Sequence, residues 1–148
     1  MLTEVYHVPQ VSYASTSASL VKDDYFLRTC APDSMSMVAL SSLVTQMGWK
    51  RVGIVSSLTT YSISAVTILG SAFSTSGVEV VGAEVFRTDE EELGSYVTSL
   101  MKQGVTITIL ICHQTDAAKF FDSAYRAGFF DGKRQVSFII ELIDLFME

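Results

Sequence analysis

Five side chains that form hydrogen bonds lie near the ends of predicted strands: Ser15, Thr16, Asp33, Ser57 and Tyr61. Hydroxyl groups both donate and accept hydrogen bonds, and a tyrosine at the start of a helix can stack on a ligand. Such groups bind a small polar molecule rather than transform it, so we take these residues as candidate ligand-binding residues. The structural alternatives are a solvated turn over residues 14–19 and a half-buried Tyr61 whose hydroxyl lies in water.

The sequence lacks the common catalytic and nucleotide-binding motifs. The sequence has no G-x-G-x-x-G after a strand, no G-x-x-x-x-G-K-[ST] loop and no G-x-S-x-G elbow. Cys112 and His113 are adjacent, but neighbouring residues of an extended chain point to opposite faces, which argues against a nucleophile–base pair. No spacing of the acids pairs two carboxylates. We therefore expect no enzymatic activity, no cofactor and no metal site.

Composition indicates a folded domain. The 148 residues are 49% hydrophobic and 18% charged, which fits one domain, or one domain and a piece of another. The net charge of −6 and the lack of a basic run argue against a nucleic-acid partner. Cys30 and Cys112 lie in apolar segments, which favours two buried thiols, and a disulfide between them is the alternative.

The two ends of the sequence suggest part of a longer protein. Residues 1–10 lack the basic and apolar regions of a signal peptide, and no apolar stretch approaches the roughly 20 residues of a membrane helix. Strand-like residues follow soon after Met1, and the chain ends abruptly at residues 139–148. We therefore expect a fragment, without its own signal peptide or transmembrane segment.

Helical and strand patterns alternate from Pro32 onward. The predicted helices span about 35–47, 61–74, a segment that starts with a capping box at Thr88–Glu91 and ends at Gly104, and 115–127; the predicted strands span 52–55, 78–86, 106–112 and 135–140. Two short strands precede them at 8–13 and 25–30. This alternation predicts an α/β fold in three layers, a parallel sheet with helices on both faces.

Finer features of these helices are also predicted. Asp33 or Ser34 is expected to cap the first helix, and Gly48 and Gly77 are expected to end the first and second helices. Apolar spacing assigns buried faces to both helices: Leu40, Leu43, Val44 and Met47 in the first, and Ile63, Val66, Gly70 and Phe73 in the second.

An ordered series of segments resembles a known family. The series is Val-Pro-Gln-Val-Ser-Tyr-Ala-Ser-Thr-Ser from Val8, Tyr-Phe-Leu-Arg-Thr from Tyr25, Pro-Asp-Ser from Pro32, Met-Gly-Trp-Lys-Arg-Val-Gly-Ile-Val from Met47, and Tyr61-Ser62. It resembles the receptor-family ligand-binding region, with the type I periplasmic-binding-protein fold of class C G-protein-coupled receptors and natriuretic-peptide receptors. The likeness covers most of the chain.

The resemblance implies two lobes with a ligand between them. Residues 1–31 would be a remnant of lobe one and the crossing strand, and residues 32–148 a truncated lobe two. Ser15 and Thr16 fall on the loop that contacts the backbone of an amino-acid ligand, Asp33 on the acid that faces its amino group, and Tyr61 on the tyrosine that closes over it. The chain departs from the family's Tyr-Gly-x-x-Gly pattern at residues 61–65, and from its Asp-Gly-Trp-like segment after the last strand.

The expected function follows from this resemblance. The chain would be a fragment of an extracellular ligand-sensing domain that binds an amino acid or analogue and signals by lobe closure. It would lie on the extracellular side of the plasma membrane within a longer receptor, attached to the membrane only through other parts of that protein, and in a dimer of like or unlike chains. The alternatives are a flavodoxin-like regulatory or enzymatic α/β domain, or a truncated product without function of its own.

Overall fold

A single parallel sheet forms the centre of the larger part of the chain. The computed structural model describes residues 5–16, 24–130, 132 and 135–140, the last six by their backbone. The strands are β3 (Arg51–Ser57), β4 (Glu79–Phe86), β5 (Ile107–Ile111) and β6 (Gln135–Ile140), in the order β4-β3-β5-β6. Every pairing is parallel, as the alternation of elements predicted.

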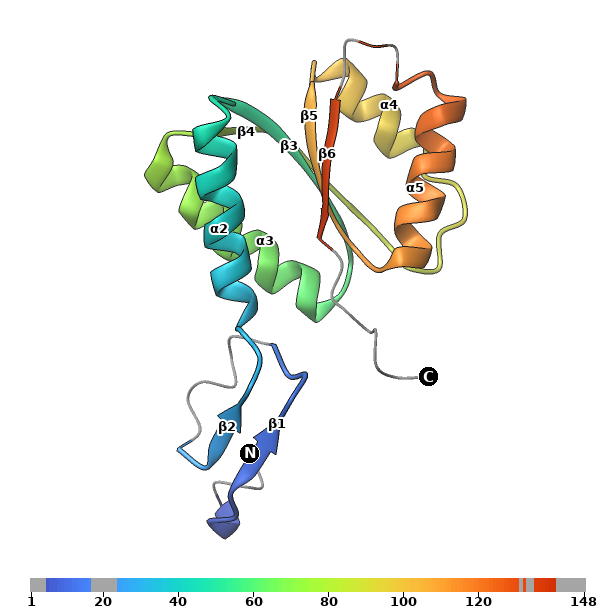
Figure 1. Cartoon of the computed structure of the whole chain (residues 1–148). Helices are drawn as coiled ribbons and strands as arrows, with labels where there is room; N and C mark the ends of the chain where they lie inside the picture. Colours follow the sequence, from blue (N-terminus) through green and yellow to red (C-terminus); the bar gives the residue numbers. More distant parts are fainter. Residues whose placement is uncertain (1–4, 17–23, 131, 133–134, 141–148) are drawn as a thin grey trace.

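Two helices cover each face of this sheet (Figure 1). One face carries α2 (Asp33–Gln46) and α3 (Thr60–Ser76), and the other carries α4 (Gly94–Lys102) and α5 (Gln114–Arg126). The predicted α/β fold with three layers is confirmed, and so is the alternating order of elements from Pro32. Within the described ranges, no helix has the length and apolar character needed to cross a membrane.

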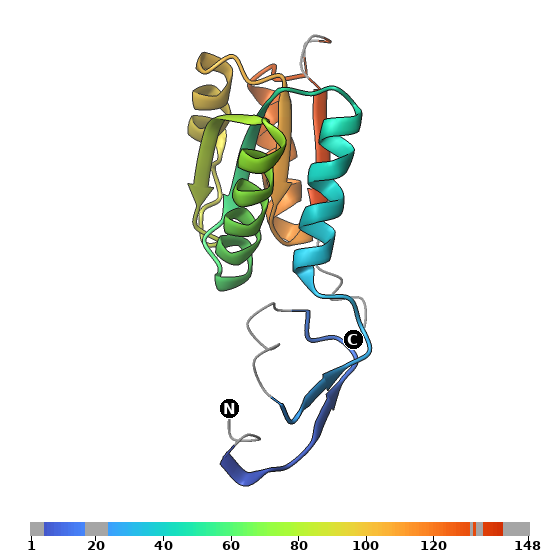
Figure 2. The same cartoon turned by 90° about the vertical axis from the view of Figure 1, so that its left-hand side faces the viewer.

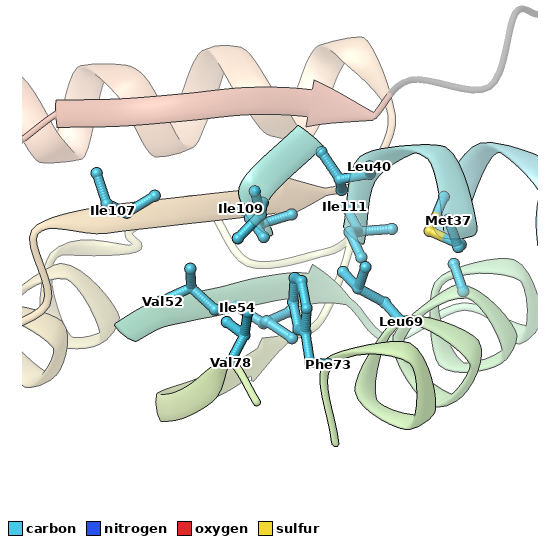
Figure 3. Close-up of a cluster of buried hydrophobic side chains, with 12 residues drawn as sticks. Met37, Leu40, Val52, Ile54, Leu69, Phe73, Val78, Ile107, Ile109 and Ile111 are labelled. Atoms are coloured by element: carbon cyan, nitrogen blue, oxygen red, sulfur yellow. The ribbon is translucent and has the colours of Figure 1, made fainter. Parts of the chain in front are cut away.

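The two central strands explain where the core lies. β5 is buried along its whole length, and β3 is buried from Val52 to Ser57. Alternate residues of these strands enter two clusters, one beneath each helix pair. Figure 3 shows the cluster beneath α2 and α3, where Phe73 and Leu69 pack towards Ile54 and Ile109. A strand buried on both faces reads as a continuous apolar run, which is why both strands could be predicted.

The buried faces of α2 and α3 differ in part from the prediction. Leu43 and Met47 of α2 are 38% and 56% exposed, and Met37 takes their place in the core. In α3, Ile63 is 52% exposed, and the buried residues are Ser62, Ala65, Leu69 and Phe73. The physical reason lies in composition, because α2 beyond its first residue and all of α3 carry no charge that would mark an outer face.

The ends of α2 and α3 show which local sequence signals determine where a helix begins and ends. Gly48 and Gly77 have φ of 73° and 71° and end α2 and α3, as predicted. At the start of α2 the prediction was wrong, since Pro32 is the N-cap and no side chain caps the helix. Asp33 is instead the first helical residue, and its carboxylate is left for other contacts.

The capping box predicted at Thr88–Glu91 is also wrong, because α4 begins only at Gly94. Lys119 Nζ on α5 donates hydrogen bonds to the carbonyls of Thr88 (3.3 Å) and Glu90 (3.4 Å). These contacts across 31 and 29 residues hold the segment as a loop, so tertiary structure overrides the local helix signal.

A second, smaller sheet precedes α2. It consists of β1 (Gln10–Ser12) and β2 (Phe26–Arg28), which pair in parallel. Both lie within the strands predicted at 8–13 and 25–30. Figures 1 and 2 show this sheet beyond the N-terminal end of α2, apart from the layered body.

The exposure of α3 leads to a stability prediction. Leu69→Ala removes a fully buried side chain and should lower the free energy of unfolding by about 2–5 kcal/mol. Ile63→Ala is the matched control on the outer face, and it should change that energy by no more than about 0.5 kcal/mol. Urea unfolding followed by circular dichroism measures both. A larger loss for Ile63→Ala than for Leu69→Ala would mean that α3 packs through the face predicted from its sequence.

Candidate functional site

Four of the five candidate ligand-binding residues come from three segments that meet at one end of the molecule. Ser15 and Thr16 follow β1, Asp33 is the first residue of α2, and Tyr61 lies in the first turn of α3. In Figures 1 and 2 the N-terminal ends of both helices point towards the β1–β2 sheet. The carboxyl ends of parallel strands share one edge of a sheet, and ligands of open α/β folds bind beyond that edge.

The turn after β1 is built by hydroxyl groups and one cation. Ser12 Oγ accepts a hydrogen bond from the Ser15 N–H (3.0 Å) and donates one to Ser15 Oγ (2.7 Å). Arg28 Nη1 on β2 donates to the carbonyls of Ser15 (3.2 Å) and Thr16 (3.1 Å). The turn therefore has a defined shape, in contrast to a loosely solvated loop.

Asp33 connects that turn to the layered body. Its backbone N–H donates to the Thr16 carbonyl at 3.0 Å, and its carboxylate accepts a hydrogen bond from the Thr16 side chain. The residue is only 9% exposed. Burial raises the pKa of Asp33 above its ordinary value, although the Thr16 hydrogen bond and the Arg28 charge act in the opposite direction. The carboxylate is thus short of solvation and favours a cationic partner.

Tyr61 shares the surroundings of Asp33. It is half-buried, and burial together with the negative charge of Asp33 raises its pKa to about 12. The phenol therefore stays protonated at neutral pH and remains a hydrogen-bond donor. The charge of Asp33 is thus near enough to influence Tyr61, although the two residues begin different helices.

Ser57 does not join this group. Its side chain is fully buried, and Ser57 Oγ lies 3.1 Å from Ser62 Oγ. Thr59 Oγ1 donates to Ser62 Oγ (2.9 Å) and accepts from the Ser62 N–H (3.1 Å). These three hydroxyls fix the start of α3 from inside. A ligand cannot reach Ser57 in this arrangement, so we remove it from the candidate contacts.

Sequence reasoning missed the roles of Arg28 and of the Thr59–Ser62 pair. In the sequence, Arg28 stands out only as part of the Tyr-Phe-Leu-Arg-Thr segment that resembles the family. Thr59 had a local signal, because a threonine before a helical segment is a preferred N-cap. For Arg28 no signal was available, since its partners lie 12 and 13 residues earlier in the chain.

Within the described residues, no other set of side chains forms a second candidate site. These residues contain no cluster of three or more His, Cys, Asp or Glu side chains that could hold a metal ion. Cys30 and Cys112 are not joined by a disulfide, and Cys30 is half-buried while Cys112 is fully buried. His113 is the N-cap residue of α5. A shallow hollow lined by Leu58, Arg87, Thr88 and Asp89 is open, and the Arg87 and Asp89 side chains already bind each other (3.0 and 3.2 Å).

Comparison with known proteins identifies the family. A sequence model of the receptor family ligand binding region matches residues 1–139. The chain belongs to this family. The ordered series of segments in the sequence is thereby confirmed as a family resemblance, and the parallel three-layer architecture agrees with it.

Relatives of this family member are glutamate receptors by name. A metabotropic glutamate receptor of Drosophila melanogaster is 28% identical over 133 residues, which are 86% of this chain and 14% of that receptor. Glutamate receptor 3.1 of Oryza sativa subsp. japonica is 25% identical over 131 residues, again 86% and 14%. Metabotropic glutamate receptor 8 of Homo sapiens is 35% identical over 68 residues, 44% and 8%. The chain thus spans a small part of these relatives.

The burial of Asp33 leads to a prediction about pH. Because the folded-state pKa is raised above 3.8, the unfolded chain loses this proton at lower pH than the folded chain. Stability is therefore lost as pH rises from 3.8 through the folded-state pKa. Asp33→Asn does not titrate, so its free energy of unfolding relative to the wild type should be higher at pH 7 than at pH 3.

Urea unfolding at both pH values measures this difference. Asp122→Asn is the control, because Asp122 is an exposed acid on α5. A relative stability of Asp33→Asn that is the same at both pH values would contradict the assigned burial of the Asp33 carboxylate.

Proposed function

We propose that the chain is part of an extracellular receptor domain that binds an amino acid or a close analogue between two lobes. In this proposal residues 1–31 are the end of lobe one and the crossing strand, and residues 32–148 are lobe two. The observation that supports it is the convergence of the Ser15–Thr16 turn, Asp33 and Tyr61 at one edge of the molecule. Membership of the receptor family ligand binding region supports the proposal that this edge is part of a ligand cleft.

The chemistry of the three segments suits an amino acid. Asp33 is a poorly solvated carboxylate, and an ammonium group would supply the missing positive charge. The Ser15 hydroxyl can donate a hydrogen bond to a carboxylate, whereas the Thr16 hydroxyl donates to Asp33 and keeps its lone pairs for a ligand donor. The neutral Tyr61 phenol has an aromatic face for stacking and a donor for a hydrogen bond.

The signal would arise from closure of the lobes. Tyr61 belongs to lobe two and Ser15 and Thr16 belong to lobe one, so a ligand that touches both stabilises the closed arrangement over the open one. We further propose that the domain lies on the outer side of the plasma membrane as part of a longer receptor, in a dimer of like or unlike chains. The glutamate receptors among its relatives support an amino acid as the first ligand to test.

Tyr61→Ala should weaken amino-acid binding, because it removes the contact that lobe two provides. We expect the dissociation constant to rise roughly 10- to 100-fold, the range found for an aromatic residue at the centre of a binding site. The measurement is isothermal titration calorimetry of the full-length protein that contains this chain, with L-glutamate first and then the other L-amino acids.

Tyr125→Ala provides the matched control, because Tyr125 lies exposed on α5, away from the cleft edge. It should bind as the wild type does. Absence of binding for every amino acid in the wild type would contradict the proposed ligand class. An unchanged affinity in Tyr61→Ala would contradict the proposed contact.

A further inference from the structure

Arg28 contacts the proposed ligand turn from behind. One guanidinium nitrogen, Nη1, donates hydrogen bonds to two consecutive carbonyls, those of Ser15 (3.2 Å) and Thr16 (3.1 Å). Consecutive carbonyls of an extended chain point in opposite directions, so a shared donor requires a turn at this place. The shape of the turn and the position of the guanidinium are therefore linked.

Both carbonyls also have a second donor. The Ser15 carbonyl accepts from Cys30 Sγ (3.6 Å), and the Thr16 carbonyl accepts from the backbone N–H of Asp33 (3.0 Å). A carbonyl oxygen has two lone pairs, so each of these oxygens is satisfied within the protein. The carbonyls of the turn are thus occupied by Arg28, Cys30 and Asp33, so the groups with which the turn can meet a ligand are its hydroxyls, of which Thr16 already donates to Asp33.

The Arg28 guanidinium lies over an aromatic ring, and its positive charge acts on Asp33. Its central carbon lies 6.0 Å from the centre of the Phe26 ring, two residues earlier on the same strand face. Its charge lowers the pKa of Asp33, against the larger effect of burial. The groups that lower the Asp33 pKa are Thr16 from the turn and Arg28 from β2, and the charge of Asp33 in turn raises the pKa of Tyr61 on α3.

We propose that Arg28 is a positioning residue of the ligand site, which fixes the Ser15–Thr16 turn and keeps a positive charge beside Asp33. It does so without touching the ligand. The inference rests on the proposed function for its biological meaning, but both of its parts can be measured without a ligand. Arginine suits the first part because the two N–H bonds of Nη1 diverge in the fixed plane of the guanidinium, whereas any permanent cation can serve the second.

Two variants separate these parts. Arg28→Lys keeps the charge and loses the planar donors, and Arg28→Gln loses the charge as well. Arg51→Gln is the matched control, because Arg51 is an exposed arginine on β3 whose partner is Glu79 (3.4 Å). Circular dichroism should show all three variants folded, since β1 and β2 lie outside the two core clusters and Arg51 is exposed.

The first measurement is amide hydrogen exchange by NMR on the full chain. The Ser15 and Asp33 N–H groups are the reporters, since they donate to Ser12 Oγ and to the Thr16 carbonyl. In both Arg28 variants their exchange should become faster by about tenfold or more, while the amide of the buried Leu69 stays unchanged. Unchanged exchange at Ser15 and Asp33 would overturn the positioning of the turn.

The second measurement is the titration of the Asp33 carboxyl carbon by NMR. Arg28→Gln should shift the Asp33 pKa upward from its wild-type position, Arg28→Lys should leave it closer to wild type, and Arg51→Gln should not move it. An Asp33 titration that is the same in Arg28→Gln and wild type would overturn the electrostatic part.

Ligand binding then distinguishes this inference from the proposed function. With L-glutamate as the probe, both Arg28 variants should bind more weakly than wild type, and the acid limb of binding should move to higher pH in Arg28→Gln alone. If exchange and titration respond as expected but wild type binds no amino acid, the ligand proposal fails and the role of Arg28 in the turn stands. If wild type binds and both variants bind equally well, Arg28 is not a positioning residue of the site.

Discussion

The hydrogen bond from the Asp33 N–H to the Thr16 carbonyl joins the two parts of the chain on which the site depends. The β1–β2 sheet has little apolar burial to hold it, since Val11 and Leu27 are 66% and 64% exposed. An isolated pair of strands is only marginally stable in water. Polar contacts at the end of α2 and around Arg28 therefore set how the turn lies relative to the acid, and small changes there alter the site without disturbing the core.

The apolar core and the candidate site meet at Tyr61. The two apolar clusters lie on either face of β3 and β5, Asp33 and Tyr61 lie at the first turns of α2 and α3, and the half-buried Tyr61 packs against the cluster beneath these helices. Burial raises the pKa of both groups, which means that the folded state disfavours their charged forms. At neutral pH only the Asp33 carboxylate therefore lowers stability, because the Tyr61 phenol is neutral in the folded and the unfolded chain alike.

The fold could be predicted largely from the sequence, because its signals are local. β5 is a continuous apolar run, and Gly48 and Gly77 end helices where a positive φ is needed. The inward faces of α2 and α3 could not be predicted fully, since neither helix has charged residues that mark an outer side. The helix start predicted at Thr88–Glu91 was wrong for the opposite reason. A strong local signal for a helix is overridden there by hydrogen bonds from Lys119 on α5.

The candidate site could be predicted only where the sequence follows the family pattern. Ser62 and Ala65 depart from that pattern and show why. Both residues stand where the family pattern has glycine, and both are buried. Ser62 is accommodated because its hydroxyl and its N–H bind Ser57 and Thr59. The start of α3 is thus fixed by side-chain hydrogen bonds, and the Ser62 amide is used by the protein itself. In the proposed site, the Ser62 amide would therefore not be available to a ligand, and the Tyr61 side chain would provide the contact from α3.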